Sequence, residues 1–243
     1  MTDHHVAARL ATEAGKLLLD VRTELAGASE AERKAEGDKR SHEYLTEALA
    51  AERPADVVLS EEGADDPVRL GAGRVWIVDP LDGTREFSEP GRVDWAVHVA
   101  LWQSGELVAG AVALPAQGIT LATPAVASPP ATAGKPRIVV SRTRPPATAL
   151  AVRDALDGTL VELGSAGAKV ASVIQGLADV YVHAGGQYEW DSAAPVAVAR
   201  AAGLHTSRID GSPLAYNQPD PLLPDLVVCR RELAGAVLAV TAR

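Results

Sequence analysis

The sequence predicts an α/β protein with two lobes, an N-terminal α+β lobe over residues 1–125 and a C-terminal α/β lobe over residues 135–243. Three patterns predict this organisation: two amphipathic helical segments open the chain, short apolar strands follow them, and strands then alternate with helices. Residues 123–136 are rich in alanine, proline, serine and glycine and carry no hydrophobic period. Because such composition is typical of a linker, we place the lobe boundary there.

The elements of the first lobe can be placed in chain order. The opening helix is expected from an apolar stripe at helical spacing, formed by Val6, Leu10, Leu17, Leu18, Val21 and Leu25. A second helix is expected over residues 38–53, where the apolar positions are Tyr44, Leu45, Ala48 and Leu49. Five strands are expected at 57–60, 75–78, 95–102, 107–114 and 119–122. Residues 103–106 are typical of a hairpin turn between the third and fourth of these strands.

The second half of the chain alternates strand-like and helix-like segments. Strands are expected at 137–141, 159–163, 180–183 and 226–229. Helices are expected near Thr148, Ala168, Ser192 and Glu232. This alternation favours an α/β lobe, and no internal repeat indicates a solenoid.

Composition limits the partners. Of 243 residues, 47% are hydrophobic and 23% charged, as in ordinary packed proteins. The net charge of −9, without a basic block, argues against a nucleic-acid polymer or an anionic membrane and leaves a small molecule as the expected partner. No apolar run reaches the roughly 18 residues of a membrane span, and residues 1–5 lack a signal-peptide pattern. We therefore expect a cytoplasmic protein.

Cysteine and histidine usage argues against soft metal sites. Cys229 is the only cysteine, which excludes an internal disulfide, and its apolar neighbours predict that it is buried. The six histidines are scattered, and only His4 and His5 are close in sequence. We expect the histidines to be core or solvated residues rather than metal ligands.

Carboxylates gather at the ends of two predicted strands. The strand over 75–78 runs directly into Asp79, and Asp82 follows it. The strand over 57–60 runs into Glu61, so neighbouring strands would deliver carboxylates to the same edge of a sheet. Hard oxygen ligands of this kind suit Mg²⁺ or Mn²⁺, and the pattern predicts a cation site.

Two other interpretations of the aspartates stay open on spacing alone. Asp79 and Asp82 can simply cap a turn, where Asp is common. A haloacid-dehalogenase-type phosphatase also has an Asp at a strand end, but its second Asp follows two residues later. The gap here is three residues, and nothing else in the chain supplies the remaining pattern of that family.

A specific resemblance covers most of the chain. The central motif of the inositol monophosphatase family of Mg²⁺-dependent, Li⁺-inhibited phosphatases resembles Trp76-Ile77-Val78-Asp79-Pro80-Leu81-Asp82-Gly83-Thr84. The Glu-Glu element of that family resembles Glu61-Glu62, and its Trp-Asp motif resembles Trp190-Asp191-Ser192-Ala193-Ala194. The resemblance implies a layered αβαβα sugar-phosphatase fold, often as a homodimer.

The resemblance also implies roles for individual residues. Two or three Mg²⁺ ions, for which Mn²⁺ can substitute, would be bound by Glu61, Asp79, the backbone carbonyl of Leu81, Asp82 and Asp191. Asp38 and Thr84 would activate the attacking water, so that no protein nucleophile is required. The usual Thr-x-Ala-Asp context is replaced here by Glu36-Gly37-Asp38, and the alternative for Asp38 is a surface residue at a helix start.

Residues after the central motif favour the bisphosphate nucleotidase branch of the family. Three stretches resemble that branch: Gly83-Thr84-Arg85-Glu86-Phe87, Val140-Ser141-Arg142 and Gly164-Ser165-Ala166-Gly167-Ala168-Lys169. The Gly-Ser turn is expected to present free amide hydrogens to an anion, with Lys169 adding a charge. The expected substrate contacts are Leu81, Asp82, Gly83, Thr84, Arg92, Ser141, Arg142, Arg144, Gly164, Ser165, Lys169 and Asp191.

The branch implies hydrolysis of the 3′-phosphate of 3′-phosphoadenosine 5′-phosphate to AMP, in sulfur metabolism. Inositol 1-phosphate and fructose 1,6-bisphosphate stay open as substrates, although the acidic residue that inositol enzymes place several positions before Trp-Asp is missing. The Gly-Ser turn can be an ordinary helix cap, and the arginines can be surface residues. A non-catalytic nucleotide- or metal-binding protein is the remaining alternative, supported by the altered context of Asp38.

Overall fold

The first half of the chain builds a five-stranded sheet in the computed structural model, which describes residues 1–131 and 134–242. Its strands follow chain order, the first pair parallel and the others antiparallel: β1 (Val57–Ser60), β2 (Arg74–Asp82), β3 (Ala96–Gln103), β4 (Glu106–Leu114) and β5 (Ile119–Ala122). Ser104 and Gly105 join β3 to β4 with positive φ angles of 46° and 100°, as a tight two-residue hairpin requires. All five predicted strands and the predicted hairpin are therefore confirmed.

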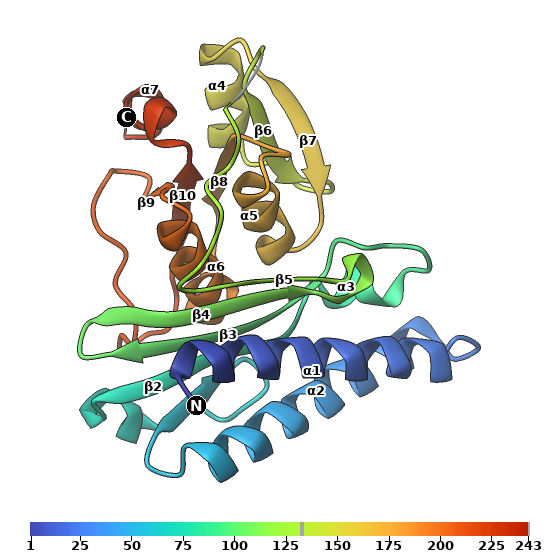
Figure 1. Cartoon of the computed structure of the whole chain (residues 1–243). Helices are drawn as coiled ribbons and strands as arrows, with labels where there is room; N and C mark the ends of the chain where they lie inside the picture. Colours follow the sequence, from blue (N-terminus) through green and yellow to red (C-terminus); the bar gives the residue numbers. More distant parts are fainter. Residues whose placement is uncertain (132–133, 243) are drawn as a thin grey trace.

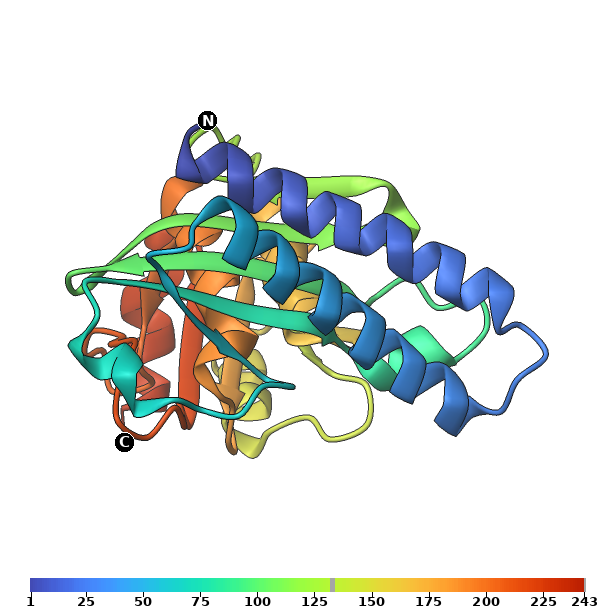
Figure 2. The same cartoon turned by 90° about the horizontal axis from the view of Figure 1, so that it is seen from below.

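Two long helices pack side by side on one face of this sheet (Figure 2). The stripe of α1 (Asp3–Glu24) buries Val6, Leu10, Leu18 and Val21, while Leu17 and Leu25 are partly buried against the same core. The second helix, α2 (Glu30–Glu52), begins well before the predicted residue 38, because Ser29 and Glu32 form a capping box at its start. Asp38 consequently lies inside the helix, so the alternative of a surface aspartate at a helix start was wrong.

The second half builds another five-stranded sheet in the order β7-β6-β8-β10-β9. Its strands are β6 (Arg137–Ser141), β7 (Thr159–Leu163), β8 (Val180–Ala184), β9 (His205–Ser207) and β10 (Asp225–Cys229). The helices are α4 (Ala147–Ala155), α5 (Ala166–Ile174), α6 (Glu189–Ala201) and α7 (Arg231–Thr241), and short α3 (Thr84–Ser88) belongs to the first half. Among the α-helices and strands of the described residues, β9 and α3 were not predicted, because neither is long enough to show a hydrophobic period.

The order of the layers follows from which helix faces are apolar. Every residue of α5 is buried, and α6 is buried from Ser192 to Ala199, as expected of helices enclosed between two sheets. Helices α1 and α2 cover the outer face of the first sheet, and α4 and α7 cover that of the second (Figure 1). This arrangement confirms the α/β class and the layered αβαβα fold.

The connection between the sheets coincides with the predicted linker, of which Thr132 and Ala133 lie outside the described residues. Hydrogen bonds join Thr123 to Gly110 of β4. The Thr123 amide donates to the Gly110 carbonyl oxygen at 2.9 Å, and the Gly110 amide donates to the Thr123 hydroxyl at 3.0 Å. One hydrophobic core fills the space between the two sheets and contains residues of both. The division of the chain into two lobes stays a prediction. Cys229 is buried, as predicted. Over the part of the chain described, we find no helix with the length and apolarity needed to cross a bilayer.

Candidate active site

Three aspartates from two distant segments converge beside the middle layer. Asp79 and Asp82 lie in the last part of β2, and Asp191 lies in the first turn of α6. Each offers a carboxylate oxygen, and these oxygens lie within 4.8 Å of one another. Asp79 is 1% exposed and Asp82 is 6% exposed. The fold therefore brings together three of the residues that the sequence predicted as metal ligands.

Glu61 reaches the same edge of the sheet. It directly follows β1, which runs parallel to β2 and pairs Ser60 with Val78, the residue before Asp79. Although the side chain as a whole is exposed, the protein atoms crowded around its carboxyl, followed by the charge of Asp191, raise the pKa of Glu61 to about 7. Glu61 thus belongs to the electrostatic environment of the aspartates.

The acidic cluster is well suited to a cation. Burial, followed by the charge of Glu61, raises the pKa of Asp79 well above its usual range, and burial with the charge of Asp82 raises that of Asp191 to about 6. Such shifts arise because desolvated carboxylates repel one another. A divalent cation would offset this repulsion, and oxygen-only ligand sets of this kind fit hard cations.

Chelation should therefore destabilise the protein. We expect the melting temperature to fall by about 5–10 °C when EDTA replaces 10 mM Mg²⁺. This is the shift expected when a ligand present at about a hundred times its Kd is removed from a protein of this length. Differential scanning fluorimetry at matched ionic strength measures this, with Na⁺ in place of Mg²⁺ as the control. Identical melting curves in EDTA and Mg²⁺ would contradict a cation site.

The local sequence explains how β2 ends. The pairing of β2 with β3 shifts between Asp79 and Asp82, where Pro80 has no amide hydrogen for the ladder. The carbonyl of Pro80 instead accepts a hydrogen bond of 2.6 Å from the Ser41 hydroxyl of α2. At Gly83, φ is 85°, and an added Cβ would lie 2.7 Å from the Cβ of Ser165. Glycine therefore permits both the turn and the close approach of α5.

Asp38 and Thr84 meet beside this turn. The Thr84 hydroxyl lies 3.2 Å from Asp38 Oδ1 and 3.2 Å from the carbonyl oxygen of Leu81. Burial, followed by the charge of Glu62, raises the pKa of Asp38 to about 6. An added Cβ on Gly37 would lie 2.7 Å from the Phe87 ring, so glycine lets α2 approach α3 closely. The altered sequence context of Asp38 thus still delivers its carboxyl to Thr84.

A cavity of about 430 Å³ opens beside the aspartates. Its walls are formed by the metal motif, the end of β6, the start of α5 and the end of β8. Of the predicted substrate contacts, those that line it are Asp82, Gly83, Ser141, Arg144, Gly164, Ser165, Lys169 and Asp191. The cavity has room for a small phosphorylated molecule next to the acidic cluster.

A family model described as the inositol monophosphatase family matches residues 3–242. The chain belongs to the inositol monophosphatase family. It is 54% identical over 239 residues to a Mycobacterium tuberculosis protein named 3′-phosphoadenosine 5′-phosphate phosphatase, covering 95% of this chain and 90% of that relative. The family resemblance read from the sequence is thereby confirmed.

Solved structures of the family share the fold. Inositol monophosphatase II of Staphylococcus aureus aligns with a TM-score of 0.84 at 19% identity, over 100% of this chain and 94% of that one. CysQ of Bacteroides thetaiotaomicron, a bacterial member of the family, aligns with a TM-score of 0.75 at 29% identity, over 93% and 96% of the two chains.

In this member of the family, the turn before α5 does not offer free amides. The Asp82 carboxylate accepts from the amides of Ala166, at 3.1 Å, and Gly167. The Ser165 hydroxyl accepts from the amide of Ala168 at 2.9 Å, so the first turn of the helix is capped from within the protein. The expectation of free amide hydrogens for an anion was wrong, because the positive end of the helix dipole already stabilises Asp82.

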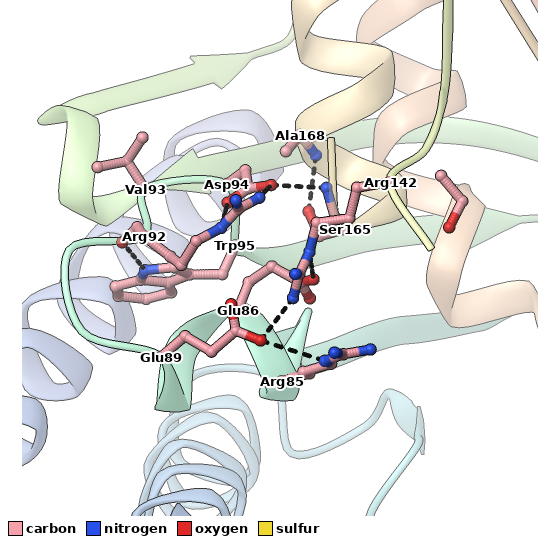
Figure 3. Close-up of polar contacts among 12 residues, drawn as sticks. Arg85, Glu86, Glu89, Arg92, Val93, Asp94, Trp95, Arg142, Ser165 and Ala168 are labelled. Atoms are coloured by element: carbon pink, nitrogen blue, oxygen red, sulfur yellow. Dashed lines mark hydrogen bonds and ion pairs between the residues drawn. The ribbon is translucent and has the colours of Figure 1, made fainter. Parts of the chain in front are cut away.

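Asp94 holds the residues just before α5. Its carboxylate accepts from the amide of Gly164 at 2.6 Å, and its carbonyl oxygen accepts from the amide of Ser165 at 3.2 Å. Arg92 pairs with the same carboxylate through two of its nitrogens (Figure 3). Arg92 therefore supports the turn at the cavity wall, and it is not among the residues that line the cavity.

Arg142 is likewise engaged by carboxylates. Its guanidinium donates to Glu86 and to Glu89, each at 2.7 Å, and Arg85 contacts Glu89 from the other side (Figure 3). Glu86 is buried and presses on Gly164, where an added Cβ would lie 2.1 Å from the Glu86 Cδ. Arg142 thus joins β6 to α3 and lies outside the cavity lining, whereas Arg144 lines it.

Two buried cationic or titratable side chains complete the site. Lys169 is 5% exposed, donates to the carbonyl oxygen of Gly164, and lies 5.5 Å from the centre of the Tyr181 ring. His98 of β3 is fully buried and touches Asp82. Sequence reasoning placed this histidine among core or solvated residues and missed its contact, since nothing in its local sequence signals a distant aspartate.

Proposed function

We propose that this protein is a phosphomonoesterase that hydrolyses the 3′-phosphate of 3′-phosphoadenosine 5′-phosphate, giving AMP and phosphate. The observation that carries this proposal is the 54% identity to the Mycobacterium tuberculosis phosphatase of that name over nearly the whole chain. The aspartate cluster beside the 430 Å³ cavity supports it, because it provides a place where a phosphate ester meets cations.

We propose Mg²⁺ as the cofactor, as two or three ions for which Mn²⁺ can substitute. The residues that would hold it are Glu61, Asp79, the carbonyl of Leu81, Asp82 and Asp191. When bound, such cations neutralise charge on a phosphoryl group and make a water more acidic. The oxygen-only donor set and the raised pKa values of Asp79 and Asp191 support this assignment.

The chain's own residues then handle the proton. We propose that the attacking water gives its proton to Asp38 by way of the Thr84 hydroxyl, which lies 3.2 Å from the carboxylate. The water oxygen bonds to phosphorus while the bond to the 3′ oxygen breaks, and that oxygen takes a proton from solvent. A carboxylate with a pKa near 6 is a better proton acceptor than one near 4, which supports the role of Asp38.

Arg144 is the side chain that we propose for the second phosphate of the substrate. It lines the cavity and is exposed, and within residues 1–131 and 134–242 no carboxylate pairs with it. Its amide donates to the Ser141 hydroxyl at 3.3 Å, which fixes the start of its loop. Since Arg92 and Arg142 are held by carboxylates and the α5 amides are taken, Arg144 supplies the available guanidinium.

Arg144→Ala should weaken binding of the bisphosphate. We expect KM for 3′-phosphoadenosine 5′-phosphate to rise about tenfold with kcat little changed, the value of about one charge-assisted hydrogen bond. KM for a monophosphate such as inositol 1-phosphate should change far less. Arg153→Ala, on the outer helix α4, is the matched control. An equal rise in KM for both substrates would remove Arg144 from this role.

Parallel assays of phosphate release test the function directly. The compounds are 3′-phosphoadenosine 5′-phosphate, its sulfated form, inositol 1-phosphate and fructose 1,6-bisphosphate, each with Mg²⁺ and with or without Li⁺. We expect the adenosine bisphosphate to give the highest kcat/KM, with inhibition by Li⁺. Comparable rates for all four would indicate a broad phosphatase, and no release would favour a binding protein. The homodimer and the cytoplasmic location stay predictions.

A further inference from the structure

His98 lies between the two segments that supply the acidic cluster, the end of β2 and the start of α6. It pairs with Asp79 across the β3–β2 ladder and has no solvent exposure. Its Nε2 lies 3.2 Å from Asp82 Oδ2, an ion-pair distance without hydrogen-bond geometry, and its Nδ1 lies 3.1 Å from the carbonyl oxygen of Trp190. The ring therefore stands between a carboxylate of β2 and a carbonyl of α6.

The Asp82 carboxylate is gripped from two directions. One oxygen accepts from the Ala166 amide, and the other accepts from the Gly167 amide beside His98. An added Cβ on Gly167 would lie 2.0 Å from His98 Nε2, so the start of α5 and the ring are packed without spare room. Rotation of the carboxylate would have to displace either the ring or the helix.

The second contact of the ring fixes the other part of the cluster. Trp190 directly precedes Asp191, and both lie in the first turn of α6. The ring contacts the Trp190 carbonyl at one nitrogen and Asp82 at the other. It therefore fixes the position of Asp82 relative to the first turn of α6, which carries Asp191. Among the described side chains, His98 is the one that places a ring nitrogen within 3.2 Å of each of these two segments.

We propose that His98 is a positioning residue that holds Asp82 and the start of α6 in the arrangement a divalent cation requires. This inference rests on the metal site of the proposed function. Side chains that orient metal ligands from behind typically change metal affinity 10–100-fold when they are replaced. Loss of His98 should accordingly weaken Mg²⁺ binding, while excess Mg²⁺ restores most of kcat.

Two near-isosteric variants separate the contacts of the ring. The amide of His98→Gln reaches roughly as far as Nε2 and can still contact Asp82, whereas that of His98→Asn reaches roughly as far as Nδ1. We measure Mg²⁺ binding to the substrate-free protein by isothermal titration calorimetry. We expect a Kd raised about 10–100-fold in His98→Asn and His98→Ala and less than about threefold in His98→Gln. His205→Asn, on β9, is the control and should bind as wild type.

Melting in EDTA distinguishes positioning from packing. Lower melting temperatures for all three variants with an unchanged Mg²⁺ Kd would overturn the proposal, because His98 would then only fill space. Equal weakening in His98→Gln and His98→Asn would overturn the part assigned to the Asp82 contact. If wild-type protein bound no Mg²⁺, the metal site itself would fail, an outcome distinct from the first two. Should His98→Ala not fold, the Gln and Asn pair carries the comparison.

Discussion

Asp82→Asn is expected to lower kcat/KM by about a thousandfold or more while the protein stays folded. Asp82 is the carboxylate with the most partners in the site: two amides of α5, the His98 ring, and the neighbouring aspartates. Removing one negative charge from a cation site forfeits about 4 kcal/mol or more of charge stabilisation in the transition state, which corresponds to about three powers of ten in rate.

Stability should respond much less. Asparagine keeps an oxygen that can accept from the Ala166 amide but loses the acceptor for the Gly167 amide, and this loss is partly offset because the repulsion that raises the pKa of Asp79 and Asp191 is relieved. Steady-state kinetics with Mg²⁺ and a melting curve in EDTA measure the two effects. Asp154→Asn, an exposed residue of α4, is the control. Activity within about tenfold of wild type would refute the role of Asp82 as a ligand.

The fold was largely predictable because most of its strands are short runs rich in apolar residues. The runs that became β1, β5, β6 and β7 gave the observed bounds, since polar residues, glycine or proline flank each run and mark where the strand ends. The start of α2 escaped because residues 30–37 are polar and carry no apolar stripe. Its signal was the capping box of Ser29 and Glu32, which was not used.

The site was predictable where its functional residues lie close together in the sequence. Asp79 and Asp82 share one motif, and their convergence with Asp191 followed from the family resemblance. What could not be predicted is which polar groups are already occupied. Arg142 and Glu86 are distant in sequence. Only the fold shows that they pair, that Asp82 accepts from the first amides of α5, and that Asp94 accepts from the amide of Gly164 before this helix. His98 belongs to the same class of tertiary contacts.

Asp38→Asn is expected to lower kcat by about a hundredfold to ten-thousandfold, the usual contribution of a general base. The Thr84 hydroxyl can still donate to the asparagine oxygen, so the turn should keep its shape, but the amide cannot accept the proton of the attacking water. KM should change little, because Asp38 is not among the residues that line the cavity. Thr84→Val should lower kcat similarly, and the double variant should be no worse than either single one, since both act on one proton path.

The same substitution should make the metal-free protein more stable at neutral pH. Burial raises the pKa of Asp38 from 3.8 to about 6 in the folded state, so the ionised carboxylate opposes folding. Relative to wild type, the gain in unfolding free energy should be absent below about pH 4, grow as pH rises to about 6, and stay constant above it. We expect about 1–2 kcal/mol, less than the full shift because the side chain is partly exposed. Urea unfolding in EDTA at pH 4.5 and pH 8 measures it. If Asp38 is retained for catalysis at the expense of folding, its replacement lowers kcat and raises the unfolding free energy. A variant that loses both activity and stability at pH 8 would therefore indicate that Asp38 is structural.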